Sequence, residues 1–295
     1  MKKKILKLLL GTLVVTLMGT AIGCGGSNSN NDTSNSDNLE GSVTLSGSSA
    51  LLPLVEASID GFNEKYPDIE VSAQAGGSGT GLTQVTDGSV NIGNSDVEAA
   101  DKLDKEKADE LVDHKVIAQG FAVVVSKGLG VDALTKAQIQ DIFSGKVTNW
   151  KNVGGKDLEI TVIHRPESSG TRATFVSTIL DGDASLEDSN IGITQDNNGN
   201  VLTAMESNEG AISYLALSYL TSDEAKDKIS AVSIDGVEPT TKNITTNKYA
   251  FWSYGHMYTK GKATKVQKAL IDYIMSEDNK EVVESLGYIP ASDMQ

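Results

Sequence analysis

The sequence contains little of the chemistry that forms disulfides or binds metals. Cys24 is the only cysteine among the 295 residues, so an intrachain disulfide is excluded. The histidines are His114, His164 and His256; none is close to another in the sequence, and no HExxH pattern or carboxylate cluster accompanies them. The sequence therefore predicts neither a metal site nor a cofactor.

Basic residues are also scarce. The chain has 25 Lys and Arg residues against 40 Asp and Glu residues, which gives a formal net charge of -15 at pH 7. This charge argues against nucleic acid and anionic lipid as partners. A small anion in a closed cleft remains compatible with it, because salt screens repulsion beyond about 8 to 10 Å while hydrogen bonds inside the cleft persist.

The N-terminal segment has the pattern of an export signal. Lysines precede a mostly apolar run from Leu8 to Ile22, which ends in small residues before Cys24. The run is shorter than the about 20 apolar residues of a transmembrane helix. The residues before the cysteine resemble a lipobox, so we expect a signal peptide over 1–23 and acylation of Cys24, for example with palmitate. The alternative is a plain secretory signal with an incidental thiol.

The next segment predicts a flexible tether. Residues 27–38 read SNSNNDTSNSDN and contain no apolar side chain, so they cannot offset the entropy of ordering. We therefore expect a lipid-anchored tether over 24–40. The folded body would start at residue 41 and would be held to the membrane through the lipid anchor only.

Hydrophobic periodicity predicts alternating strands and helices in the rest of the chain. Strands are expected at SVTL, IEVSAQA, FAVVVS, LEITVIH and GAISYLAL. Helices are expected from Leu51 to before Pro67, after GGSGTG, and at TKAQIQDIF, SSGTRATFVSTIL, KATKVQKALIDYIMS and NKEVVESLG. This order predicts an α/β fold whose ligand-binding loops follow the strands.

Three of these loops share a design that suits an anion. SGSSALL around Ser48, GGSGTGL around Ser78 and ESSGTRA around Ser169 each lead into a predicted helix. A helix N-terminus carries unpaired N–H groups and partial positive charge, and hydroxyls add donors. The alternative for each loop is an ordinary N-cap. GGSGTG lacks the lysine of a nucleotide-binding P-loop, so a nucleotide site is not predicted.

Two charged residues refine the prediction. Arg165, in HRPESSGTR, offers a planar fork of donors that fits two oxygens of a tetrahedral anion. Its alternative role is a surface salt bridge with Glu167. Asp96, in NIGNSDVE, would repel a fully ionised anion but can accept a hydrogen bond from a protonated one. The alternative for Asp96 is a turn or helix cap.

Together these motifs resemble those of the phosphate-binding lipoproteins of ABC-type high-affinity phosphate importers. SGSSALLPL, GGSGTGLTQV, NIGNSDVE, IQDIFSGKVTNWKNVGG, HRPESSGTRATF, EGAISYLALSYL and LGYIP occur in the same order as in that family, over essentially all residues after the tether. The resemblance implies a periplasmic-binding-protein type II fold with a ligand cleft between two α/β lobes. The first lobe is expected at 41–119 and 248–295, and the second at 120–247.

The resemblance also implies the site. Matching the motifs residue by residue gives a phosphate site of Ser49, Ala50, Leu51, Ser78, Asp96, Arg165, Ser169, Gly170 and Thr171. The chain departs from the family pattern at SSALL, where the family often has a threonine, and at Glu167, where some relatives have aspartate. Neither departure removes the donors of the anion site.

We therefore expect a monomeric, extracytoplasmic solute-binding protein, not an enzyme. It would capture inorganic phosphate and deliver it to the transmembrane subunits of an ABC permease. The closest alternative is a receptor for sulfate or molybdate. An exported phosphatase would need a nucleophile and an activating base, for which only His164 beside Arg165 is a candidate. The sequence is also compatible with a surface adhesin or sensor.

Overall fold

The computed structural model describes residues 39–295, so the predicted signal peptide, Cys24 and all but the end of the predicted tether lie outside the described residues. The strands are β1 (Gly41–Gly47), β2 (Ile69–Ala75), β3 (Ile92–Ser95), β4 (Leu111–Ser126), β5 (Ala133–Leu134), β6 (Thr161–His164), β7 (Ile193–Thr194), β8 (Ala211–Ala216), β9 (Ile229–Ala231), β10 (Ser233–Ile234), β11 (Trp252–Lys260) and β12 (Tyr288–Pro290). The α-helices are α1 (Leu52–Lys65), α2 (Ser78–Asp87), α3 (Lys105–Ala108), α4 (Lys136–Phe143), α5 (Gly170–Thr178), α6 (Asn198–Glu206), α7 (Asp223–Lys228), α8 (Thr241–Thr245), α9 (Lys265–Ile274) and α10 (Lys280–Ser285).

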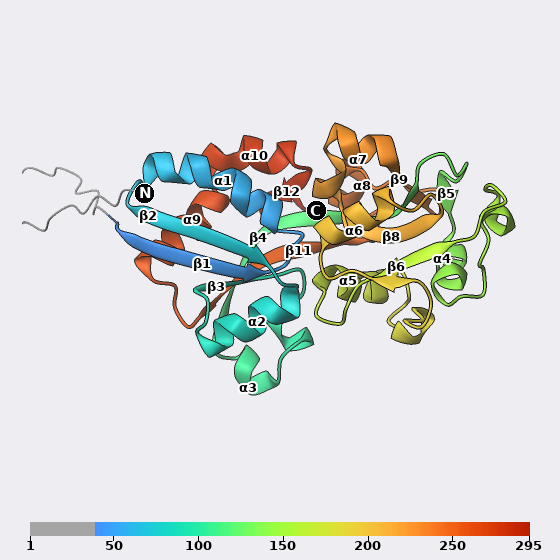
Figure 1. Ribbon diagram of the computed structural model, residues 1–295. Coiled ribbons are helices and arrows are strands. Elements are labelled where there is room, and N and C mark those ends of the chain that lie inside the picture. Colours follow the sequence, from blue (N-terminus) through green and yellow to red (C-terminus); the bar gives the residue numbers. More distant parts are fainter. Residues whose placement is uncertain (1–38) are drawn as a thin grey trace, which may run out of the picture. The chain divides into compact units, whose positions relative to one another are not determined.

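Most strands form one mixed sheet, with helices packed against it (Figure 1). Its order is β2-β1-β3-β11-β4-β8-β6-β7, and β9 and β12 also pair with β4. Strand β1 is parallel to β2 and β3, and β6 is parallel to β7 and β8. The parallel strands on each side of β4 are followed by helices, which is the α/β arrangement expected from the sequence.

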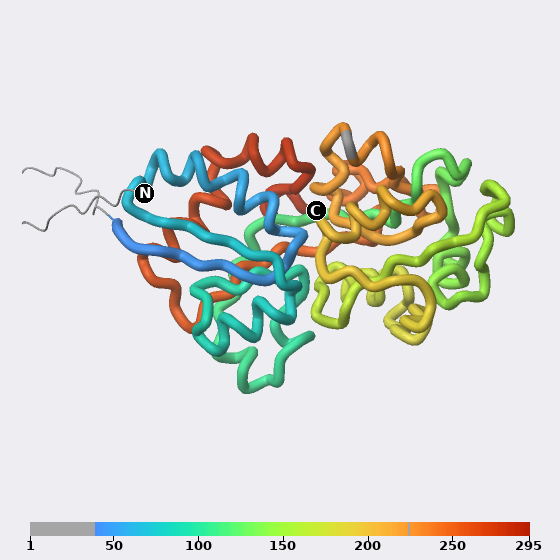
Figure 2. The backbone as a smooth tube through the Cα atoms, viewed as in Figure 1, coloured from blue at the N-terminus to red at the C-terminus, as the bar shows by residue number. Residues whose placement is uncertain are grey.

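Strand β4 connects the two halves of this sheet. Its residues 111–120 pair with β11, whereas its residues 121–125 pair with β8. Figure 2 shows the N-terminal blue segment and the C-terminal red segment together at one end, and the yellow and green segments at the other. The predicted lobe boundary at 119/120 falls within β4, at the point where the partner strand changes. The lobe division itself stays a prediction.

Each half has its own apolar core. On the side of β1, buried residues from the first strand, α1 and α9 pack together, among them Leu45, Phe62 and Leu270. On the other side the core is rich in aromatic rings, and Phe175 of α5 stacks on Tyr214 of β8 with centroids 4.2 Å apart. Burying each such side chain contributes about 1.5 to 3 kcal/mol to the free energy of folding. The core of each half therefore stabilises the strands and helices from which the loops extend.

The element predictions were right in kind and less accurate in extent. Helix α1 ends at Lys65, before Pro67 as predicted, and β8 is buried throughout. Strand β4 begins ten residues earlier than the predicted Phe121, because its first residues are partly exposed and read as a charged stretch. The sequence analysis did not identify β11. Among residues 39–295, no helix has the length and hydropathy needed to span a bilayer.

Candidate functional site

The predicted site residues lie where parallel strands end. Ser49 lies in the loop after β1, Ser78 begins α2 just after β2, Asp96 follows β3, and Arg165 follows β6. The carboxyl ends of parallel strands are the usual position of ligands in α/β sheets, because the loops and helix N-termini converge there. The fold therefore gathers these loops at the junction of the two halves of the sheet.

Asp96 is at the centre of the hydrogen bonds between these loops. Its side chain is buried, and its Oδ1 atom accepts hydrogen bonds from the Ser48 hydroxyl and, at 2.7 Å, from Gln119 Nε2. Its Oδ2 atom has one long contact, 3.4 Å, from the Thr171 hydroxyl. Asp96 does not act as a helix cap, since the 3₁₀ turn that follows begins after Glu98 and has no side-chain cap.

Burial raises the pKa of Asp96 above its ordinary value, while hydrogen bonds from Ser48 and Gln119 and the charge of Arg165 lower it. The opposing effects have a common physical basis. Desolvation disfavours the carboxylate, and donors or a cation nearby favour it. The Asp96 carboxylate is therefore desolvated, and its affinity for a proton depends on the hydrogen-bond donors and the cation next to it.

The loop at the start of α5 approaches Asp96 closely. A Cβ atom on Gly170 would lie 2.0 Å from Ser78 Oγ and 2.7 Å from Asp96 Oδ2, so glycine is required for this contact. The Gly79 amide donates to the Ser168 carbonyl at 2.9 Å, and the Lys102 ammonium donates to the Glu167 carbonyl at 2.8 Å. The HRPESSGTR loop is thus joined to the loops of the other half of the sheet.

Arg165 is a buried cation with unused donors. Its side chain is 3% exposed, and its Nη2 atom donates to the Asp196 carbonyl at 3.2 Å. Its Nε and Nη1 atoms have no hydrogen-bond partner among the described residues. Burial lowers the pKa of Arg165, and Tyr214 and Asp96 act in the opposite direction. Unpaired buried donors on a cation are costly, so an anionic acceptor fits this position.

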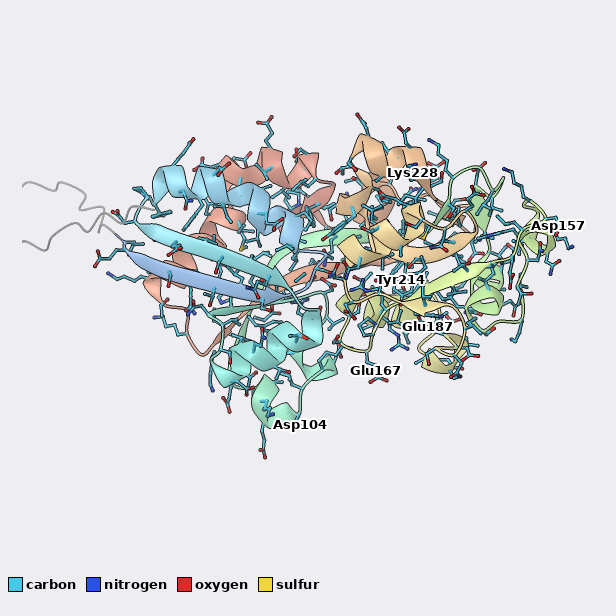
Figure 3. The ribbon with its side chains drawn as sticks, viewed as in Figure 1. Asp104, Asp157, Glu167, Glu187, Tyr214 and Lys228 are labelled. Carbon is cyan, nitrogen blue, oxygen red and sulfur yellow. The ribbon has the colours of Figure 1, made fainter. Side chains whose placement is uncertain are left out.

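The alternative role considered for Arg165, an ion pair with Glu167, is wrong. Glu167 is exposed at the surface, where Figure 3 labels it, and its carbonyl rather than its carboxylate is engaged, by Lys102. The Arg165 side chain is buried instead, and its one side-chain hydrogen bond is to the Asp196 carbonyl. The guanidinium is therefore held by the fold and not by a surface carboxylate.

The first loop is packed differently from the expectation. The Ala50 and Leu51 amides, which were expected to bind the ligand, donate instead to Ser48 Oγ of their own loop, at 3.1 and 3.3 Å. Ser49 Oγ accepts hydrogen bonds from Asn198, at 3.1 Å from the amide N and 2.8 Å from Nδ2. Ser49 thus connects β1 to α6, a contact that the sequence analysis did not foresee.

The remaining predicted residues begin α5. Ser169 is the N-cap of this helix, and its hydroxyl accepts a hydrogen bond from the Arg172 amide at 3.1 Å. Thr171 lies between Asp96 and Asn198, at 3.4 and 3.5 Å. An ordinary N-cap is the alternative considered for each of the three loops. It applies to the loop before α5, where the Ser169 side chain is the cap, but α1 and α2 have no side-chain cap.

A second buried cluster supports this helix. Glu187, which is 5% exposed, accepts hydrogen bonds from Arg172 Nε at 2.7 Å and from the Tyr214 hydroxyl at 2.9 Å, and contacts His164 Nδ1 at 3.0 Å. Figure 3 shows Glu187 and Tyr214 in the same half of the molecule. His164 ends β6, as expected, and is occupied by this carboxylate. Within residues 39–295, no group of three His, Cys, Asp or Glu residues could hold a metal ion.

The sequence analysis missed three residues that reach the site: Gln119, Asn198 and Tyr219. Gln119 interrupts the apolar run VIAQGFAVVV, and an isolated buried amide needs a polar partner. That signal could have identified it. Asn198 and Tyr219, which donates to the Ser49 carbonyl at 2.8 Å, had no such signal, because both lie in polar or mixed segments.

Comparison with known proteins gives concordant results. A family profile described as PBP superfamily domain matches residues 29–278. Phosphate-binding protein PstS of Bacillus subtilis is 47% identical over 302 aligned residues, which cover 100% of this chain and 97% of the relative. PstS of Staphylococcus aureus is 28% identical over 94% of this chain and 87% of its own length.

Solved structures are similar as well. A phosphate ABC transporter substrate-binding protein from Clostridium perfringens, solved with bound phosphate, superposes with a TM-score of 0.77 and 33% identity, over 85% of this chain and 100% of that one. An ABC-type phosphate transport receptor from Vibrio cholerae has a TM-score of 0.64 and 26% identity, with the same coverage. These likenesses cover 85% of this chain.

Proposed function

Because the chain belongs to the PBP superfamily and, within it, to the phosphate-binding proteins, we propose that it captures inorganic phosphate outside the cytoplasm and delivers it to an ABC-type permease. Its role is that of a binding protein. The permease subunits would recognise the loaded protein, and the phosphate would leave it unchanged.

Arg165 is the observation that carries the proposal. Two of its nitrogen atoms, Nε and Nη1, are buried without a partner among residues 39–295, and of the carboxylates that act on its charge Asp96 has a larger effect than Asp196. A phosphate ion can accept from both nitrogens, because the guanidinium fork matches two oxygens of a tetrahedral anion. The ion would also compensate the desolvation of the cation, a compensation to which Tyr214, Asp96 and Asp196 already contribute.

The other site residues are assigned to phosphate on the same basis. We assign donors to Ser78, Ser169, Gly170 and Thr171, at the N-termini of α2 and α5, where helix dipoles favour an anion. Ser49, Ala50 and Leu51 complete the set predicted from the sequence. For Ala50 and Leu51 this requires their amides to exchange Ser48 Oγ for a phosphate oxygen, a small shift within one loop.

Asp96 gives the site its preference for phosphate over sulfate. Its Oδ2 atom has only the long contact with Thr171, and it can accept a hydrogen bond from a protonated phosphate. Sulfate carries no proton at neutral pH, so one of its oxygen lone pairs would face the carboxylate oxygen of Asp96, with no hydrogen between them. That arrangement leaves a buried acceptor unpaired and repels the ligand.

The capture mechanism proposed here uses two lobes. With lobes at 41–119 plus 248–295 and at 120–247, the hydrogen bonds between Gly79 and Ser168 and between Asn198 and Ser49 cross the cleft. Their formation would exclude water around a bound ion, as in hinge-type binding proteins. Acylation of Cys24 would keep a monomeric protein at the outer face of the cell membrane.

The runner-up functions make different predictions. A phosphatase would need a base, but His164 Nδ1 is engaged by Glu187, and its Nε2 is buried without a partner. A sulfate or molybdate receptor would not need Asp96. If Asp96 selects for the protonated ion, Asp96→Asn weakens discrimination against sulfate more than it weakens phosphate binding; unchanged discrimination would contradict that role.

The test is isothermal titration of the purified protein, stripped of bound anion, with phosphate and with sulfate at neutral and acidic pH. We expect tight phosphate binding, little heat from sulfate, and no release of phosphate from a phosphate ester in the same preparation. Equal affinity for sulfate would indicate a general oxyanion receptor. Absence of binding to either ion would refute the proposed function.

A further inference from the structure

Gln119 is a buried amide on the strand that joins the two halves of the sheet. Its side chain is 1% exposed, and its position on β4 is opposite Ser253 of β11 and Tyr288 of β12. Ladder pairing on both sides fixes its backbone, and the neighbouring Gly120 is packed against Leu217 and Ile244. The amide is therefore presented to the site from a rigid element rather than from a loop.

The carboxylate that Gln119 contacts has two unequal oxygens. Gln119 Nε2, at 2.7 Å, and the Ser48 hydroxyl both donate to Asp96 Oδ1. Oδ2 has only the Thr171 hydroxyl at 3.4 Å, and it faces Gly170 at the N-terminus of α5. One oxygen is thus committed to donors of the protein, and the other is available at the place where the anion-binding loops meet.

The chemistry of the amide favours this division of the two oxygens. Its NH₂ group can only donate and its carbonyl oxygen can only accept, so the carboxylate fixes which end faces it. If Oδ1 were protonated, its hydrogen would conflict with the hydrogens that Ser48 and Gln119 already donate to the same atom. Ser48 can rotate its hydroxyl hydrogen away, whereas Gln119 can accept a hydrogen bond there only by turning its amide so that Oε1, which has no hydrogen-bond partner among the described residues, replaces Nε2. With the amide in the orientation observed, a ligand proton is accepted at Oδ2.

We infer that Gln119 is a positioning residue that determines the specificity of the site: by binding Asp96 Oδ1 it keeps the carboxylate ionised and directs Oδ2 toward a protonated tetrahedral anion. This inference rests on the proposed function and deepens it. The groups that face Asp96 from the packed elements are Arg165, which favours its charge, and the hydroxyls of Tyr219 and Tyr288. Of these, Arg165 is the cation, and it also binds the ligand in the proposed site.

Two variants test the inference by their opposite dependence on pH. Gln119→Met has a similar volume but no donor, so Asp96 takes up a proton more readily. We expect the ratio of phosphate to sulfate affinity to fall about 10-fold, the worth of one hydrogen bond to a charged group, with the largest loss at acidic pH. Gln119→Glu can donate to Asp96 only while the two carboxylates share a proton, so its discrimination should fall as the pH rises.

The measurements are titrations of the full chain with inorganic phosphate and sulfate between acidic and mildly alkaline pH. Gln140→Met is the matched control, because Gln140 lies on α4 and donates to the Ile179 carbonyl and the Asp181 carboxylate just after α5, and not to Asp96. It should keep the wild-type ratio at every pH. Gln119→Glu, which nearly preserves the shape, also serves if Gln119→Met fails to fold.

The possible outcomes separate the inference from the function. If the wild-type protein prefers phosphate and both Gln119 variants keep its ratio and its pH profile, the inference is wrong and the proposed function stands. A parallel loss of affinity for both anions, without a change of the pH profile, would also overturn it, since this is the effect of a merely structural residue. If the wild-type protein does not bind phosphate, the proposed function itself fails.

Discussion

The hydroxyl of Ser49 accepts two hydrogen bonds from Asn198, a residue 149 positions later in the chain, at 3.1 Å from its backbone amide and 2.8 Å from Nδ2. The Tyr219 hydroxyl donates to the carbonyl of the same serine at 2.8 Å. Ser49 follows β1 and Asn198 begins α6, so these bonds join the first loop of the site to the half of the sheet that carries Arg165.

Ser49→Ala should therefore destabilise the protein. The change leaves two buried Asn198 donors without their acceptor, which costs about 1 to 3 kcal/mol in free energy of unfolding. Urea denaturation followed by circular dichroism measures it. Ser177→Ala is the control, because the Ser177 hydroxyl is exposed on α5 and bonds only to Thr174; its effect should stay within about 0.5 kcal/mol. Equal effects of both changes would show that the Ser49 contact contributes nothing.

Arg165→Met should separate stability from binding. Phosphate affinity is expected to fall about 100-fold or more, because two charge-assisted hydrogen bonds are lost. Without phosphate the variant should be as stable as the wild-type protein or more so, since a buried guanidinium with unpaired Nε and Nη1 atoms is replaced by an apolar chain.

The matched control for this variant is Arg172→Met. Arg172 is bound to Glu187 at 2.7 Å, so its loss breaks a partly buried pair and should lower the melting temperature of the protein without phosphate. Thermal melts with and without phosphate distinguish the two variants. An Arg165→Met protein that is destabilised but binds phosphate normally would contradict the assignment.

Asp96 should make stability depend on pH. Since burial raises its pKa in the folded protein above the ordinary 3.8, the folded state binds more protons than the unfolded state between the two values. The stabilisation from this proton is present below the ordinary value and is lost as the pH rises through the folded pKa. Asp96→Asn removes the effect, so the difference in unfolding free energy between variant and wild type should shift in favour of the variant as the pH rises from 3 to 7. A constant difference would contradict it.

Glu187→Ala should be the most destabilising of these changes. It removes the common partner of His164 and Tyr214, which are buried, and of Arg172, which is partly buried, and breaking such a cluster costs about 3 to 5 kcal/mol. Asp157→Asn is the control, because Asp157 pairs with Lys151 at the surface, where Figure 3 shows it. Chemical denaturation should detect no change for the control; a small effect of Glu187→Ala would mean that the cluster is replaced by other contacts.

Much of the local structure could be predicted, because it depends on residues near each other in the sequence. The spacing of apolar residues predicted α1, α5 and α9, and Pro67 marked the end of α1. Strand β11 escaped prediction because WSYGHMYTK alternates poorly: its first residues are half-buried, and Gly255 to Thr259 are buried in succession. A central strand covered on both faces has no period-two signal.

The sequence alone determined that the chain has loops of glycine, serine and threonine at helix starts, with Arg165 and Arg172 beside one of them, and a carboxylate that suits a protonated anion. Tertiary structure decided which atoms are used. In the fold, Asp96 Oδ1 accepts hydrogen bonds from Ser48 and Gln119, and Ser49 accepts from Asn198. Arg165 is buried and donates to the Asp196 carbonyl, so it makes no ion pair with Glu167. The physical reason is that a buried polar group must find its partner wherever the fold brings one, and the partners of Ser49 lie 149 and 170 residues away.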